Sequence, residues 1–178
     1  MKPIVLYCKS YRTDLNRVIR LTQSIKYFNV DNIPFYISVP ECDLDLFRKN
    51  ICNQIANIIS DDDIISASPN ITQERVNRTP GNIAQQIVKS EFWRLNLSYT
   101  YLCVDSDSFF IRPFSATDFL SPDGTPYTML DEGHELLNDA IQNKKINILL
   151  DFYKEAEQLQ KIFGREGRHY SFGPFPVV

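Results

Sequence analysis

Short apolar runs alternate with amphipathic segments through the first half of this 178-residue chain. Residues 4–7 form an apolar run rich in β-formers, and the polar residues 9–12 separate it from a segment with a helical repeat. Thr13 or Asp14 is available as the N-cap of that helix. Its apolar face carries Leu15, Val18, Ile19, Ile25 and Phe28. The order of strand, loop and helix predicts a helix that covers a sheet.

The same order recurs further along the chain. Residues 34–40 hold a compact strand between two prolines, and residues 43–55 present their apolar side chains on one helical face. The remaining patterns predict strands at 58–59, 99–104 and 127–130, helices at 82–97 and 146–163, and a long loop at 66–81.

Strands that alternate with helices of about 12–16 residues indicate βαβ units. We therefore expect an α/β fold with a mostly parallel sheet flanked by helices on both faces, in a single domain over residues 1–178. Such sheets bind ligands at the carboxyl ends of their strands. The functional residues should lie just after Tyr7, Ile59 and Val104.

The charges and cysteines exclude several classes of protein. The chain has 19 Lys and Arg against 22 Asp and Glu without a basic run, so we expect no nucleic-acid partner. No apolar stretch approaches the ~20 residues of a membrane span, and the first run is too short for a signal peptide, so a cytoplasmic protein without a transmembrane segment is expected. The cysteines should be reduced, because Cys8, Cys42, Cys52 and Cys103 stand far apart without a C-x-x-C pair, and mostly buried, because two of them lie inside apolar strand-like runs.

Two carboxylates, Asp105 and Asp107, flank Ser106 where the most strand-like run of the chain ends. Mg²⁺ and Mn²⁺ prefer oxygen ligands and are usually held by one or two carboxylates together with substrate phosphate oxygens. Asp105 and Asp107 are therefore candidate metal ligands. A turn or helix cap, in which the same side chains bond to the backbone, is the structural alternative.

The segment 81–114 reads GNIAQQIVKSEFWRLNLSYTYLCVDSDSFFIRPF and resembles the helix, strand and Asp-x-Asp stretch of GT-A glycosyltransferases. It is most similar to bacterial putative polysaccharide transferases, distantly of the glycogenin type. The resemblance implies a GT-A, Rossmann-like fold that transfers a sugar from a nucleoside-diphosphate sugar, UDP-linked by preference, to a saccharide or glycan acceptor with Mn²⁺ or Mg²⁺. It makes Asp107 the direct metal ligand and places Asp105 on the ribose or on a metal-bound water.

Further binding residues follow from the same resemblance. A basic residue on the preceding helix approaches the donor in related transferases, which makes Lys89 a candidate, although a solvated lysine is the alternative. Ser10, Tyr11 and Arg12 occupy the place of the base and ribose contacts. Trp93 is expected to pack in the core rather than to stack on a sugar. Residues 61–63 could include a base-contacting acid, but a solvated turn is the preferred interpretation.

Acids that could act on the acceptor lie later in the chain. Asp131 and Glu132 are the candidate catalytic residues, with Glu135 as a further acid. His134 could bind metal, and His169 lies in an aromatic loop at 168–174 that could hold an acceptor sugar.

Two other functions remain open. A haloacid-dehalogenase-type phosphatase also has a strand that ends in Asp-x-Asp, but it needs a small hydroxyl residue where this chain has Phe109. A degenerate GT-A module could bind nucleotide or carbohydrate without turnover. The apolar end of the sequence further predicts a chain that is incomplete at its C-terminus, with a patch that a second copy could cover.

Overall fold

The computed structural model describes residues 2–127 and 133–163. These residues fall into two compact units, one over 2–127 and one over 133–163, which are described separately. This division concerns compactness alone, and the nucleotide-sugar-binding domain predicted over residues 1–178 stays a prediction.

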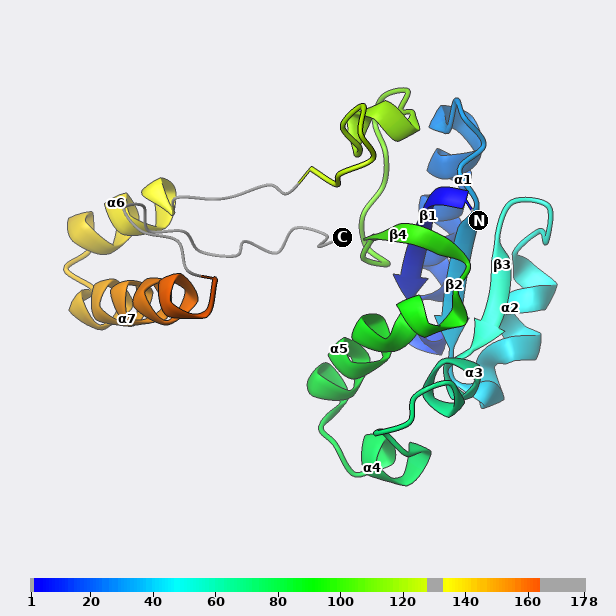
Figure 1. Cartoon of the computed structure of the whole chain (residues 1–178), viewed down its shortest axis with the longest axis horizontal. Helices are drawn as coiled ribbons and strands as arrows, with labels where there is room; N and C mark the ends of the chain where they lie inside the picture. The colour runs from blue at the N-terminus through cyan, green and yellow to red at the C-terminus, as the bar shows by residue number, and fades with distance from the viewer. Residues whose placement is uncertain (1, 128–132, 164–178) are drawn as a thin grey trace. The chain divides into compact units, whose positions relative to one another are not determined.

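The first unit is built on a four-stranded parallel sheet with the strand order β3-β2-β1-β4 (Figure 1). Its strands are β1 (Lys2–Lys9), β2 (Phe35–Val39), β3 (Asn57–Ser60) and β4 (Ser98–Cys103). In β1, Leu6 pairs with Phe35 of β2 on one side and with Leu102 of β4 on the other. The predicted α/β fold with a parallel sheet is confirmed.

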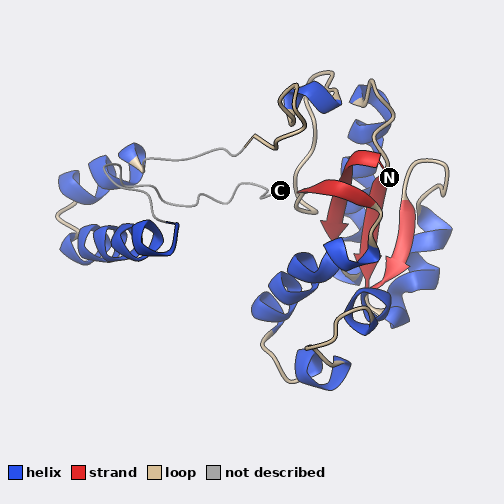
Figure 2. Cartoon of the chain, viewed as in Figure 1, coloured by secondary structure: helices blue, strands red, loops and turns tan. Residues whose placement is uncertain are grey.

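Helices pack on both faces of this sheet (Figure 2). The helices of the first unit are α1 (Leu15–Phe28), α2 (Leu44–Asn50), α3 (Asp61–Ser66), α4 (Gln73–Asn77) and α5 (Gly81–Glu91). One face packs against α1 and α2, through buried residues such as Leu21 and Phe47. The other face packs against α3 and α5, through buried residues such as Ile64 and Val88. Because β1 is covered on both faces, its centre is continuously apolar, as expected for an inner parallel strand.

Short 3₁₀ helices connect several of these elements. They are η1 (Arg12–Asp14), η2 (Glu41–Asp43), η3 (Phe92–Leu95) and η4 (Ala116–Asp118). The segment η3 follows α5 directly, and its C-cap residue Asn96 has a left-handed backbone with φ of 50°.

The second unit consists of two helices, α6 (His134–Gln142) and α7 (Ile146–Phe163). They pack against each other through buried Ala140, Phe152 and Ala156. Gly133 precedes α6 with φ of 67°, and a Cβ atom at this position would lie 2.5 Å from Cε2 of Phe152. Glycine is therefore required there both by the backbone conformation and by the packing of Phe152.

Several local expectations were wrong. The helix predicted over 43–55 ends at Asn50, because the backbone of Ile51 is extended. Helix α4 lies inside the loop predicted at 66–81, and α6 begins at His134 in a stretch interpreted as polar loop. The solvated turn preferred for 61–63 is the first turn of α3, with Asp61 buried. Most of the strand predicted at 127–130 lies outside the described residues.

Two predictions of burial were also wrong. Trp93 is 51% exposed, and its neighbour Phe92 fills the core position instead, stacked on Tyr7 with ring centroids 3.8 Å apart. All four cysteines are free, as expected, but Cys42 and Cys52 are exposed.

Among residues 2–127 and 133–163, no helix is both long enough and apolar enough to cross a membrane. The predicted cytoplasmic location stays a prediction.

Candidate functional site

The carboxyl ends of the parallel strands bring the predicted binding segments to one edge of the sheet. The backbone N–H of Val104 donates to the carbonyl of Tyr7 at 2.8 Å, and that of Ser10 donates to the carbonyl of Ser38 at 2.9 Å. The loops after β1, β2 and β4 therefore begin side by side. This is the edge at which parallel α/β sheets bind ligands.

The aspartate pair lies where β4 leaves the core. Val104 is buried, whereas Asp105 and Asp107 are exposed and Ser106 is half-buried. The backbone turns here, since the N–H of Ser108 donates to the carbonyl of Asp105 at 3.0 Å. Among the described residues, no hydrogen bond or ion pair engages the carboxylate of Asp107. The motif thus presents one carboxylate that is free to bind a ligand.

Lys89 contacts the first aspartate of the motif. Its Nζ lies 2.6 Å from Oδ1 of Asp105, and only 14% of the lysine side chain is exposed, against 54% for the aspartate. The backbone at Lys89 is anchored to the sheet, because the hydroxyl of Tyr101 donates to the Lys89 carbonyl at 3.0 Å. The alternative interpretation, in which Lys89 is a freely solvated lysine, does not fit this contact.

Asp14 links the loop after β1 to the motif. The hydroxyl of Ser106 donates to Oδ2 of Asp14 at 3.2 Å, and Arg17 donates to the other carboxylate oxygen at 2.9 Å. Asp14 occupies the N-cap position of α1, as predicted, but its side chain makes no capping hydrogen bond. Only the tertiary structure shows that its carboxylate is used to hold Ser106.

The three residues predicted to contact the nucleoside have different surroundings. Ser10 is buried, and its hydroxyl has no hydrogen-bond partner among the described residues. Tyr11 is 46% exposed, so its ring is accessible. Arg12 donates to Asp43 both from its backbone N–H, at 2.9 Å, and from Nε, at 2.7 Å. Burial raises the pKa of Asp43, but these bonds from Arg12 outweigh it and the net pKa is lowered, so Asp43 is ionised.

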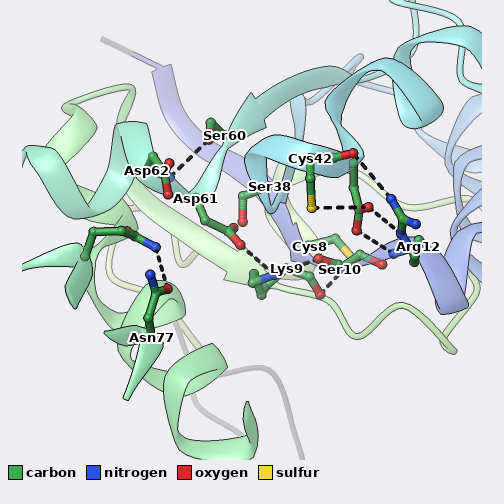
Figure 3. A network of polar contacts seen from close by, with 12 residues as sticks. Cys8, Lys9, Ser10, Arg12, Ser38, Cys42, Ser60, Asp61, Asp62 and Asn77 are labelled. Carbon is green, nitrogen blue, oxygen red and sulfur yellow. Dashed lines mark hydrogen bonds and ion pairs between the residues drawn. The ribbon is translucent and has the colours of Figure 1, made fainter. Parts of the chain in front are cut away.

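A buried ion pair joins the ends of β1 and β3, as Figure 3 shows. Nζ of Lys9 lies 2.9 Å from Oδ2 of Asp61, with both side chains about nine-tenths buried. Nζ of Lys9 also donates to the carbonyl of Ser10 at 2.6 Å. Burial raises the pKa of Asp61, and the attraction of Lys9 offsets this only in part. The other oxygen, Oδ1, is buried without a partner among the described residues.

Two thiols, Cys103 and Cys8, lie in strands that end at this edge and have raised pKa values. Burial raises the pKa of Cys103, two residues before Asp105, to about 11, although the charge of Lys89 opposes the shift. Burial likewise raises the pKa of Cys8 to about 12. Because Mg²⁺ and Mn²⁺ prefer oxygen to sulfur, the candidate ligands for them at this edge are the exposed carboxylate oxygen atoms.

Comparison with known proteins gives a family. A family profile described as "Family of unknown function (DUF6492)" matches residues 2–173. The chain belongs to DUF6492. No curated protein and no solved structure matches it. The family match covers the whole sheet, the aspartate pair and the helical unit of this DUF6492 chain.

The oxygen atoms of the DUF6492 motif fit a hard divalent cation in type and in accessibility. Asp105 and Asp107 can supply two carboxylates, and Mg²⁺ usually takes one or two from a protein when substrate phosphates complete its shell. Within the described part of the chain, no group of three or more His, Cys, Asp or Glu side chains is arranged to hold a metal. Further ligands would come from substrate, water, uncharged oxygen atoms of the described chain or residues outside that part.

The candidate acceptor-side residues lie outside the first unit or outside the described residues. Asp131 and Glu132 lie outside the described residues, as do His169 and the loop at 168–174. His134 is the first residue of α6, and Glu135 follows it, both in the second unit. The catalytic roles of Asp131 and Glu132 stay predictions.

One hollow on the first unit, of about 870 Å³, is at the edge of the sheet between α2 and β3 and contains none of the predicted site residues. Another, an open groove of about 490 Å³, runs between α1 and residues 109–111 after the motif. Arg20 lies over the Phe109 ring in this groove, 5.6 Å from its centroid. Periodicity could not predict either hollow.

Proposed function

We propose that this chain is a metal-dependent glycosyltransferase with a GT-A-like fold, which takes a sugar from a nucleoside-diphosphate sugar. UDP is the nucleotide that the resemblance favours. The acceptor would be a saccharide or glycan. The observation that carries the proposal is the exposed pair Asp105 and Asp107 at the carboxyl end of β4, with the ammonium of Lys89 held against it. Carboxylates for a cation and a lysine for phosphate are the groups that a nucleoside diphosphate needs.

The surrounding residues support separate roles in binding this donor. Asp107, which is exposed and unpaired within the described residues, would hold Mn²⁺ or Mg²⁺ directly. Asp105 would act through a bound water or on the ribose, and Ser106, fastened to Asp14, keeps the motif loop in place. The bound cation would neutralise charge on the departing diphosphate. Tyr11 exposes its ring beside the same edge, where it could stack on a base.

The position of the motif in the sheet weighs against a haloacid-dehalogenase-type phosphatase. In that family the motif tends to lie near the N-terminus. Here the first strand, β1, ends in Lys9 and Ser10, and Asp105 follows the fourth strand. Phe109, where a small hydroxyl residue would be needed, is 53% exposed.

Calorimetry with UDP, in the presence and absence of Mn²⁺, tests the proposal. We expect Asp107→Ala to abolish metal-dependent binding of UDP, because it removes the direct ligand. Asp105→Ala should weaken binding by about 10-fold or more, as for a group that acts through a metal-bound water. Asp45→Ala serves as the control, because Asp45 is an exposed aspartate on α2 and should leave binding unchanged.

Unchanged metal-dependent affinity in either motif variant would contradict the assignment. Hydrolysis of UDP-sugars then separates a transferase from a degenerate module. A wild-type chain that binds UDP with Mn²⁺ but never releases the sugar would favour the module.

A further inference from the structure

The ammonium of Lys89 neutralises part of the negative charge that would attract a divalent cation to Asp105 and Asp107. Its Nζ is 2.6 Å from Oδ1 of Asp105, which is a short charge-assisted hydrogen bond. The aspartate pair and Lys89 together amount to two carboxylates and one ammonium, a net charge of −1. The neighbouring Asp14 adds nothing to this charge, because Arg17 pairs with it at 2.9 Å.

The position of Lys89 is fixed by the fold. The residue lies in the last turn of α5, and the hydroxyl of Tyr101 on β4 donates to its carbonyl. Only 14% of its side chain is exposed, so the apolar stem is packed while the ammonium reaches the aspartate. An ammonium on a packed stem cannot move far from Asp105 without losing that packing.

A cation held by Asp107, with Asp105 acting through a metal-bound water, would therefore sit close to a second positive charge. The carboxylate of Asp105 would then serve both the ammonium of Lys89, through Oδ1, and the metal-bound water, so both cations would share one anionic group. Divalent-cation affinity falls as the negative charge of a site is reduced. A diphosphate reverses this balance, because its negative oxygens can bond to the ammonium and to the cation at once.

We propose that Lys89 makes cation binding depend on the nucleotide: it keeps the affinity of the Asp105 and Asp107 pair for a free divalent cation low, and it allows the cation to bind tightly only together with a nucleoside diphosphate. This inference rests on the proposed function and adds regulation of the same site. By linkage, the cation and the diphosphate then raise each other's affinity by the same factor, and Lys89 increases that factor.

The test measures binding rather than turnover, with the full 178-residue chain. Binding of Mn²⁺ alone is followed by electron paramagnetic resonance, and binding of UDP with and without Mn²⁺ by calorimetry. In Lys89→Gln we expect Mn²⁺ alone to bind about tenfold tighter, because one positive charge is removed. The mutual enhancement between Mn²⁺ and UDP should fall by about the same factor.

Matched variants separate charge from packing. Lys89→Arg keeps the positive charge and should keep the weak binding of Mn²⁺ alone. Lys89→Met retains an apolar stem and should behave as Lys89→Gln, which secures the result if the polar amide disturbs folding. Lys145→Gln removes the lysine of a different ion pair, in which Nζ of Lys145 lies 2.9 Å from Oδ2 of Asp139. It should change neither the affinity for Mn²⁺ nor the affinity for UDP.

The outcomes distinguish this inference from the proposed function. If UDP binds to the wild type with Mn²⁺ but neither Lys89→Gln nor Lys89→Met binds Mn²⁺ more tightly, the role of Lys89 is refuted and the nucleotide site stands. If UDP binds to no variant under any condition, the proposed function fails, and the inference fails with it.

Discussion

Ion pairs in the two units differ in how deeply they are buried, and burial decides what each contributes. Lys9 and Asp61 form a pair with little solvent access, whereas Lys145 and Asp139 form one with about half of each side chain exposed. An exposed pair is worth about 0–1 kcal/mol, because water screens it. Breaking a buried pair by removing one partner costs about 3–5 kcal/mol, since a charge is left without compensation.

Lys9→Met should therefore destabilise the chain by about 3–5 kcal/mol at pH 7. Without Lys9, the pKa of Asp61 rises further above its ordinary value, because burial still raises it and the charge and hydrogen bond of Lys9 no longer lower it. In the unfolded chain the carboxyl group of Asp61 ionises at its ordinary pKa. The folded chain therefore loses stability as the pH rises from that ordinary pKa towards the raised one. The loss should therefore shrink by up to about 1.4 kcal/mol per pH unit as the pH falls from the raised pKa of Asp61 towards the ordinary one. Urea unfolding of both proteins at several pH values measures this.

Lys145→Met is the matched control for that prediction and should cost about 1 kcal/mol or less. A loss in Lys9→Met that is equal at every pH from the ordinary pKa of Asp61 upwards would show that packing of the lysine stem matters rather than the charge of Asp61.

At the scale of elements, the segment from α5 through η3 to β4 positions the candidate site. Phe92 packs against three tyrosines, of which Tyr7 lies on β1 and Tyr101 on β4. Tyr101 in turn bonds to the carbonyl of Lys89. The aromatic cluster under the sheet edge thus fixes the end of α5 that carries Lys89.

Phe92→Ala should destabilise the chain by about 3–5 kcal/mol, because it leaves a cavity among these rings. Trp93→Ala, one position along, should cost about 1 kcal/mol or less, since it removes an exposed ring and one contact with Arg94, 4.4 Å from the ring centroid. Chemical denaturation followed by circular dichroism compares the two. Equal losses would show that the indole is buried in solution.

At the scale of the whole molecule, ligand binding to the folded chain alone raises its stability by mass action. A UDP-sugar at one hundred times its dissociation constant adds about 2.7 kcal/mol. For a chain of this size that corresponds to a rise in Tm of roughly 5–10 °C.

We therefore expect thermal shift with a panel of nucleotide sugars to show stabilisation by UDP-sugars with Mn²⁺, and little by the same sugars with EDTA. The panel also identifies the base and the sugar. Stabilisation by none of them would contradict the proposed donor, and stabilisation that does not need Mn²⁺ would contradict the role of the aspartate pair.

Much of the architecture could be predicted from local patterns. The apolar residues of α1 and α7 repeat at helical spacing, and both helices were expected at their observed positions. The four strands were also expected in place, with β4 ending just before Asp105. Patterns failed where the periodic signal was short, as in α4, or where two neighbouring aromatic residues competed for one core position, as at Phe92 and Trp93.

By itself, the sequence determined the parallel α/β sheet and the place of Asp105 and Asp107 at a strand end, because strand and helix periodicities are local properties of the chain. Only the tertiary structure decided that Lys89 binds Asp105, that Lys9 binds Asp61 and that Asp14 holds Ser106. These partners lie 16 to 92 residues apart in the chain. Their meeting depends on strand register and helix packing, which bring distant side chains to one edge of the sheet and leave no mark on the spacing of residues in the sequence.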